Sequence, residues 1–206
     1  MFTLLRAGLW EQMPDNLTLF PLFSGEWRKV FRMARIQTVT GIVYRGICRL
    51  PDYLLPPDEI LVRWLAEVDA IERKNKRMDA VLAELYGLFR RNGIQPVLQK
   101  GQGVAQFYEH PRLRVCGDID FYFPDKEEAS RADALVRGAE RKPDGSLCYT
   151  WDGIIVEHHR RLTDLSNPYM QTFVEDYAGR CGYASFCLSD AEEIGIKIPA
   201  PPVNLL

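Results

Sequence analysis

The sequence lacks the cysteine pattern of a zinc knuckle or of a disulfide framework. Its five cysteines are odd in number and widely spaced, and no Cys-x-x-Cys pair occurs among them. Both kinds of site need paired cysteines at suitable spacings. Free thiols are therefore expected, as in a reducing cytoplasm.

Neither a strong net charge nor a long apolar run is present. The 26 basic and 28 acidic residues leave a formal charge of −2, so the composition gives no signal for DNA binding or for an anionic membrane surface. No apolar stretch approaches the roughly 20 residues of a membrane helix. The N-terminus also lacks the basic start and unbroken apolar core of a signal peptide. We expect a cytoplasmic protein without a membrane partner.

Internal repeats and low-complexity tracts are absent as well, and the first half of the chain has helical periodicity instead. Apolar residues recur every three or four positions over residues 26–50 and again over 58–92. Asp58 is a good N-cap for the second helix, and Asn92-Gly93 is a natural C-terminal stop. These signals predict a helical N-terminal region over residues 1–92.

A basic run at residues 73–77 lies inside the second expected helix. Acidic residues at helical spacing from the run can pair with it; they are Asp69, Glu72, Asp79 and Glu84. A solvated helix face is therefore favoured over a nucleic-acid patch.

After Gly93 the pattern changes to short strands that alternate with helices. Strands are expected over 94–99, 119–123, 147–151 and 154–161, and helices over 101–108 and 127–139. This order predicts an α+β fold with a mixed β-sheet flanked by helices over residues 93–206. The tail is apolar and follows a proline-rich linker, so we expect the natural architecture to continue beyond Leu206.

Two aspartates one residue apart, Asp118 and Asp120, interrupt an otherwise apolar strand. Strand alternation puts both on one face, while Ile119 faces the core. Adjacent carboxylates repel each other unless a cation lies between them, and Mg²⁺ is usually held by one or two carboxylates together with substrate phosphates. The alternative is an edge strand with two solvated aspartates, or aspartates that cap a turn.

The stretch Lys100-Gly101-Gln102-Gly103 follows one expected strand and opens a short helix. A helix N-terminus offers unpaired amides to a phosphate, and glycines let the ligand approach the backbone. Lys100 adds a full positive charge. The alternative is a glycine turn that only joins strand to helix.

A third carboxylate, Glu157, lies on the expected strand 154–161, and His159 shares its face. Three carboxylates from two strands, near a phosphate cradle, could form a two-metal centre for in-line displacement at phosphorus. Zinc on both His158 and His159 is disfavoured, because successive strand residues point to opposite faces. A partly buried hydrogen-bonding role stays open for either histidine.

Together these motifs resemble the nucleotidyltransferase superfamily, and most closely a branch of uncharacterised bacterial nucleotidyltransferase-family proteins. That branch carries a Lys-Gly turn, a short helix that ends in tyrosine, a loop with proline and arginine, Gly-Asp-Ile-Asp and a later Glu-x-His strand. The matching residues here are Val97-Leu98-Gln99-Lys100-Gly101, Tyr108, Pro111, Arg114, Gly117-Asp118-Ile119-Asp120, Glu157 and His159. The resemblance covers residues 94–162. The chain departs from it at Gln102, because well-characterised members carry Gly-Ser or Gly-Gly at that turn.

The resemblance implies a nucleotidyltransferase-like fold and a Mg²⁺-dependent reaction. Two Mg²⁺ ions, with Mn²⁺ as an alternative, would lie on Asp118, Asp120 and Glu157, which would be the catalytic residues. A nucleoside triphosphate would bind, and its nucleoside monophosphate would move to a hydroxyl group. The expected substrate contacts are Lys100, Gly101, Gly103, Arg114 and His159.

The acceptor stays open between a small molecule, a protein side chain and an RNA end. Two other functions also stay open. One is a catalytically inactive member of the same fold that senses a nucleotide or binds a protein. The other is a toxin–antitoxin component that modifies a protein partner.

Overall fold

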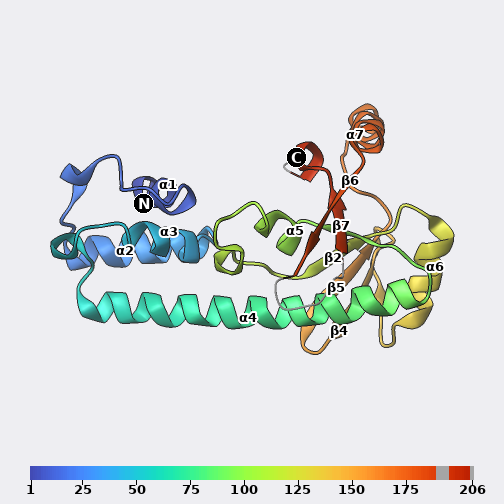
Figure 1. The fold of residues 1–206 in the computed structure, drawn as a ribbon, viewed down its shortest axis with the longest axis horizontal. Coiled ribbons are helices and arrows are strands. Elements are labelled where there is room, and N and C mark those ends of the chain that lie inside the picture. The colour runs from blue at the N-terminus through green and yellow to red at the C-terminus, as the bar shows by residue number, and fades with distance from the viewer. Residues whose placement is uncertain (189–194, 205–206) are drawn as a thin grey trace. The chain divides into compact units, whose positions relative to one another are not determined.

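The computed structural model describes residues 1–188 and 195–204, and its chain divides into two compact units. The first comprises Met1–Lys76 and Phe107–Val115, and the second comprises Arg77–Gln106 and Cys116–Leu206. Helix α4, Asp58–Arg91, contributes its first part to one unit and its second part to the other, and it can be followed in Figure 1. The expected division into domains 1–92 and 93–206 stays a prediction.

The first unit is helical around a tryptophan core. Trp27 and Trp64 are fully buried and meet edge to face, with 6.5 Å between ring centroids. The Trp64 indole N–H donates to the carbonyl oxygen of Thr40 at 3.0 Å, so its polar atom is satisfied inside the core. Besides α4, the elements of this unit are α1 (Phe2–Leu9), η1 (Leu17–Leu19), α2 (Ser24–Ile36), α3 (Thr40–Ile47), η2 (Asp52–Leu54) and η3 (Pro111–Leu113).

The prediction of one helix over residues 26–50 is wrong, because the chain breaks between α2 and α3. Thr38 has a φ of 54°, a left-handed conformation that no α-helix continues through. Both helices bury their apolar faces in the same core. The apolar periodicity therefore continues from α2 into α3, and the sequence pattern gives no sign of the break between them.

Helices α1 and α3 touch backbone to backbone at two glycines. A Cβ added to Gly46 would lie 1.9 Å from the carbonyl oxygen of Leu4, and one added to Gly8 would lie 1.9 Å from that of Ile42. Real atoms cannot approach so closely, so this helix pair requires glycine at both positions.

A partly buried acid, Glu11, ties the end of α1 to α3. Its carboxylate accepts hydrogen bonds from Arg45 Nε and Nη2 at 2.9 and 2.8 Å and another from Arg49. His110 Nε2 lies 3.4 Å from Oε1 of the same group. The hydrogen bonds from Arg45, helped by Arg49, outweigh burial and lower the pKa of Glu11 to about 2.

We expect Glu11→Gln to destabilise the first unit by roughly 2 kcal/mol at pH 7, because charged hydrogen-bond partners are lost. The folded-state pKa of Glu11 lies below its ordinary value, so this stabilisation is complete above pH 4.5 and is lost as the pH falls towards 2. Urea unfolding followed by tryptophan fluorescence should give a difference at pH 7 that shrinks near pH 2.5. Asp15→Asn is the control, since Asp15 makes an exposed ion pair with Arg6. An equal effect at both pH values would contradict the prediction.

The second unit is built on a five-stranded mixed sheet in the order β1-β2-β5-β4-β3. Strands β2 and β5 are parallel and every other pair in this sheet is antiparallel. The strands are β1 (Val97–Gln99), β2 (Ile119–Tyr122), β3 (Glu140–Arg141), β4 (Leu147–Trp151) and β5 (Ile154–His159). The unit also contains α5 (Gly101–Ala105), α6 (Lys126–Leu135), α7 (Pro168–Cys181), α8 (Pro201–Asn204) and a hairpin of β6 (Tyr183–Cys187) with β7 (Gly195–Pro199).

The expected α+β fold with a mixed sheet flanked by helices is confirmed. The four expected strands form, although three of them are shorter than predicted and two other strands, β6 and β7, come later in the chain. The helix expected over 127–139 ends at Leu135 instead, because residues 140–141 pair with β4 as an edge strand. The helix expected over 101–108 ends at Ala105.

The sheet buries an aromatic core against the second part of α4. Phe89 on α4 meets Phe121 and Phe123 edge to face, with centroids 5.4 and 5.7 Å apart. His158 lies among these rings and is fully buried. The core therefore fixes which face of β2 and β5 points inward.

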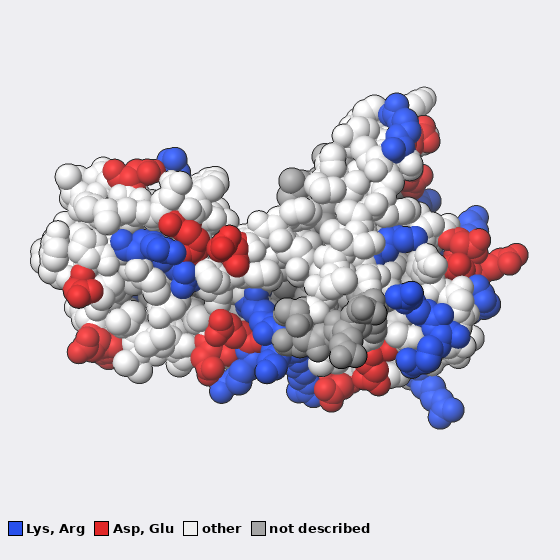
Figure 2. All heavy atoms as spheres, viewed as in Figure 1, with Lys and Arg blue, Asp and Glu red and all other residues white. Residues whose placement is uncertain are grey.

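Charges of both signs are interspersed over the face that Figure 2 draws. In the basic run, Arg73 pairs with Asp69 at 2.8 Å, and Arg77 pairs with Asp152 at 2.9 Å in the turn between β4 and β5. Among the described residues, no helix is long and apolar enough to cross a membrane.

Candidate metal and phosphate site

The parallel pairing of β2 with β5 places Asp120 directly opposite Glu157. On the other face of the same strands, Ile119 and Val156 are fully buried opposite each other. If the pairing of β2 with β5 shifted by one residue, these apolar side chains would face solvent and the acids would face the core. Burial of the apolar side chains therefore fixes the register. The two carboxylates are held side by side as a consequence.

His158 anchors β5 from the core side. Its Nδ1 lies 3.0 Å from Asp133 Oδ1, and its Nε2 lies 3.0 Å from the Tyr149 hydroxyl. Burial lowers the pKa of His158, so the neutral ring is favoured and both nitrogens have partners. Since strand side chains alternate, Glu157 and His159 face the opposite way, towards Asp120.

Asp120, Glu157 and His159 form a cluster whose ligand atoms all lie within 4.8 Å of one another. His159 Nε2 is 2.7 Å from Asp120 Oδ1 and 3.6 Å from Glu157 Oε2. Asp120 is almost fully buried. Two hard oxygen donors and an imidazole at this spacing fit a divalent cation.

Lysines approach the two acids of the cluster from either side. Lys142 makes an ion pair with Glu157 Oε1, and Lys100 Nζ lies 3.8 Å from Asp120 Oδ2. The cluster therefore carries compensating positive charge from the protein itself.

Asp118 precedes β2 and lies just outside the cluster. Burial, followed by the nearby charges of Asp120 and Glu157, raises the pKa of Asp118, and Lys100 opposes this shift. The raised pKa reflects burial first and the like charges second, and a bound cation would relieve the repulsion between those charges. Asp118 is thus near enough to interact with Asp120 and Glu157. The third member of the close cluster is His159 and not Asp118.

The Lys100–Gly103 turn is shaped by its backbone. Lys100 has a φ of 46°, a rare conformation for a residue with a side chain, and Gly101 follows with a φ of 31°. A Cβ on Gly103 would lie 3.1 Å from Ile198 Cγ2, so this glycine lets β7 pack closely on α5. Strained backbone of this kind is concentrated at functional sites.

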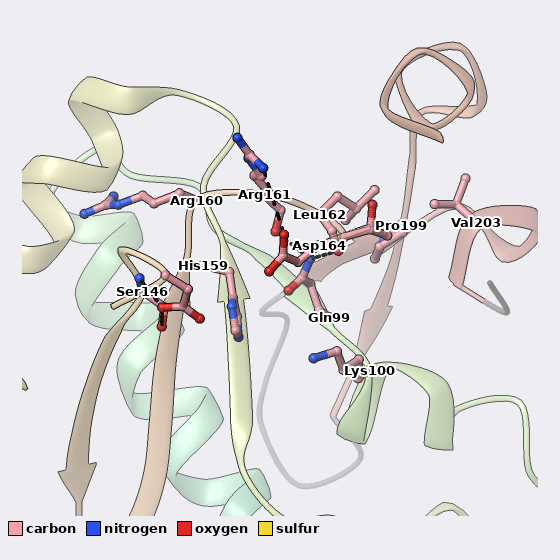
Figure 3. Close-up of a pocket in the computed structure, with 12 residues that line it drawn as sticks. Gln99, Lys100, Ser146, His159, Arg160, Arg161, Leu162, Asp164, Pro199 and Val203 are labelled. Carbon is pink, nitrogen blue, oxygen red and sulfur yellow. Dashed lines mark hydrogen bonds and ion pairs between the residues drawn. The ribbon is translucent and has the colours of Figure 1, made fainter. Parts of the chain in front are cut away.

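A cavity of about 890 Å³ opens beside the cluster (Figure 3). Lys100 directs its amine towards the side of the cavity that carries His159. Gln99 Nε2 donates to the Leu162 carbonyl at 2.7 Å and holds the segment after β5 against β1. The lining residues are Gln99, Lys100, Asp144, Ser146, His159, Arg160, Arg161, Leu162, Thr163, Asp164, Pro199 and Val203. A volume of this size accommodates a nucleotide.

The predicted phosphate contact Arg114 belongs to the first unit. It follows η3, and its carbonyl oxygen accepts a hydrogen bond from Asn75 Nδ2 at 2.7 Å. The arginines that line the cavity, among the residues that the structure describes, are Arg160 and Arg161, and the Arg160 guanidinium donates a hydrogen bond to Asp133.

Sequence reasoning missed Lys142, Arg160 and Arg161 as neighbours of the site. Arg160 and Arg161 directly follow the Glu-x-His strand, so their position after the third acid was a usable signal. The contact of Lys142 with Glu157 depends on the pairing of β4 with β5, which no spacing in the sequence reveals.

The comparisons with known proteins gave one family match. A family model described as an uncharacterised nucleotidyltransferase matches residues 24–185, which is well over half of the chain. No curated protein and no solved structure matches. The matched span contains the acidic cluster and Lys100.

Proposed function

This chain belongs to the family of uncharacterised nucleotidyltransferases, and on that premise we propose that it is a metal-dependent enzyme. It would transfer a nucleoside monophosphate from a nucleoside triphosphate to a hydroxyl group of an acceptor. The observation that carries the proposal is the Asp120–Glu157–His159 cluster at the edge of a nucleotide-sized cavity.

Asp118, Asp120 and Glu157 are the proposed holders of Mg²⁺, with Mn²⁺ as the alternative ion. Carboxylate oxygens are the ligands that both ions prefer, and the interaction of Asp118 with the charges of Asp120 and Glu157, which adds to burial in raising its pKa, supports a role in binding cations. Such ions, when bound, supply charge neutralisation at the phosphoryl oxygens. His159 either joins the ligands or keeps Asp120 oriented through its 2.7 Å contact.

The basic side chains of the cavity are the proposed holders of the triphosphate. Lys100 stands at the strained turn beside Asp120, with its amine directed across the cavity. Arg161 lies further along the wall, and arginine is suited to two-pronged phosphate contacts. Arg160 also lines the wall, and its guanidinium would have to leave Asp133 to reach a phosphate. Gly101 and Gly103 shape the turn, Arg114 remains a proposed phosphate contact, and Glu157 is the proposed base for the acceptor hydroxyl.

The direct test is a transfer assay with α-labelled nucleoside triphosphates, Mg²⁺ and a fractionated cell lysate. We expect label in a product only when metal and protein are both present, and about tenfold weaker triphosphate binding for Lys100→Met, since one charged phosphate contact is lost. Lys126→Met, on the exposed surface of α6, is the control.

The same assay separates the other functions. Metal-dependent nucleotide binding without any labelled product would favour the inactive sensing or protein-binding module. Label confined to one protein band would favour the toxin–antitoxin component. Failure of all four nucleoside triphosphates to bind would contradict the nucleotidyltransferase proposal itself.

A further inference from the structure

Lys142 is held over Glu157 by the turn between β3 and β4. The Lys142 amide donates to the Ser146 carbonyl at 2.8 Å, and the Gly145 amide donates back to the Lys142 carbonyl at 3.0 Å. Asp144 Oδ1 accepts from the Ser146 amide and hydroxyl at 2.9 and 2.6 Å, which closes the turn. These hydrogen bonds fix the turn, and none of them uses the Lys142 side chain.

The position of this turn follows from the sheet. In the antiparallel pairing of β4 with β5, Cys148 lies opposite Glu157, and in that of β3 with β4, Cys148 also lies opposite Glu140. Lys142 comes two residues after Glu140 and reaches back over β5. Its ammonium makes an ion pair with Glu157 Oε1.

This ion pair uses the carboxylate that a metal ion in the cluster would need. Glu157 is only 13% exposed, whereas Lys142 is 41% exposed. The other basic side chains near the acids are placed differently: Lys100 stays 3.8 Å from Asp120, beyond hydrogen-bond distance, and His159 lies 3.6 Å from Glu157. An ammonium and a divalent cation therefore compete for Glu157.

A released Lys142 would be close to the cavity. Asp144 and Ser146, from the same turn, line the cavity wall together with Lys100 and His159. A lysine side chain has a compact charge on a flexible stem, so it can leave one partner for another without movement of the backbone.

We propose that Lys142 is a built-in counter-cation of Glu157, which a divalent ion displaces and which then contacts the phosphate chain of the bound nucleotide. The proposal rests on the function proposed above. Metal binding alone must break the Lys142–Glu157 pair, and the triphosphate then supplies a new partner for the ammonium. Metal and nucleotide therefore favour each other's binding through Lys142, and this coupling is reciprocal.

The experiment measures Mn²⁺ binding to the full chain, first alone and then with a non-hydrolysable nucleoside triphosphate, from the spectrum of free Mn²⁺. Lys142→Met and Lys142→Gln should bind Mn²⁺ alone about three- to tenfold more tightly than the unmodified protein, an effect limited by the exposure of the pair. Both should bind the nucleotide more weakly in the presence of Mn²⁺. Lys142→Arg keeps the charge, so its affinity for Mn²⁺ alone should stay within about twofold of that of the unmodified protein. Lys126→Met should change neither the Mn²⁺ affinity nor the nucleotide affinity.

Opposite shifts of the two affinities are the signature, because a merely structural role would weaken both together. Unchanged or weaker Mn²⁺ binding in both neutral variants overturns the role of Lys142. Asp120→Asn separates this failure from failure of the site, because it should lower Mn²⁺ affinity whatever Lys142 does. If Asp120→Asn binds Mn²⁺ as the unmodified protein does, the metal site itself is refuted.

Discussion

Replacing Asp118 and Asp120 together by asparagine is expected to abolish magnesium-dependent binding of nucleoside triphosphate and to lower transfer by a factor of about 10³ or more. Asparagine has nearly the same shape but no charge, so the cluster loses its attraction for a cation. The fold should remain intact. Because burial, followed by the charges of Asp120 and Glu157, raises the pKa of Asp118 in the folded protein, removal of the two charges should leave stability unchanged or slightly higher.

Calorimetric titration with magnesium and a non-hydrolysable triphosphate checks this result, and thermal unfolding checks the fold. Asp176→Asn is the control, because Asp176 lies on the exposed surface of α7, outside the residues that line the cavity. The control should bind as the unmodified protein does. Triphosphate binding by the double variant at the original affinity would end the proposal of a metal site at these residues.

Gly46→Ala is expected to destabilise the first unit by roughly 2–3 kcal/mol, because the added methyl group would meet the backbone of α1. The new Cβ would lie 1.9 Å from the Leu4 carbonyl oxygen, and backbone, unlike a side-chain end, cannot turn away. Alanine is favoured over glycine inside a helix by about 1 kcal/mol, so the clash must exceed that gain. The loss should appear in urea unfolding followed by tryptophan fluorescence.

Gly25→Ala, in the first turn of α2, gives the opposite expectation. A Cβ at Gly25 meets nothing within 4 Å, so only the helix preference remains and stability should rise by up to about 1 kcal/mol. If Gly46→Ala and Gly25→Ala change stability in the same direction by the same amount, the claim that Gly46 is needed for close packing of α1 on α3 is contradicted.

The elements with strong local signals were predictable. Helix α4 was predicted to within one residue of its observed bounds, Asp58–Arg91, because many turns repeat one apolar stripe between a cap and an Asn-Gly stop. The break at Thr38 was not predictable from the pattern, since its positive φ depends on how α2 and α3 pack. The α7 helix and the β6–β7 hairpin carried weaker periodicity and were missed.

The candidate site was predictable only in part. Strand alternation placed Glu157 and His159 on one face, as observed. That Asp120 lies opposite Glu157 depends on the long-range pairing of β2 with β5, which alternation within each strand cannot specify. The ion pair of Lys142 requires a further strand pairing and a flexible side chain. The roles assigned to the site residues stay predictions.

Because β2 and β5 run in the same direction, the chain that leaves the end of β2 must cross back to the end of the sheet at which β2 begins before it can enter β5. It does so through α6 and the strands β3 and β4. Backbone hydrogen bonds between the two neighbouring strands set the spacing of the two acids, whatever the length of that return path. An insertion or deletion in this return path would therefore reshape the cavity wall that it builds without moving one acid away from the other.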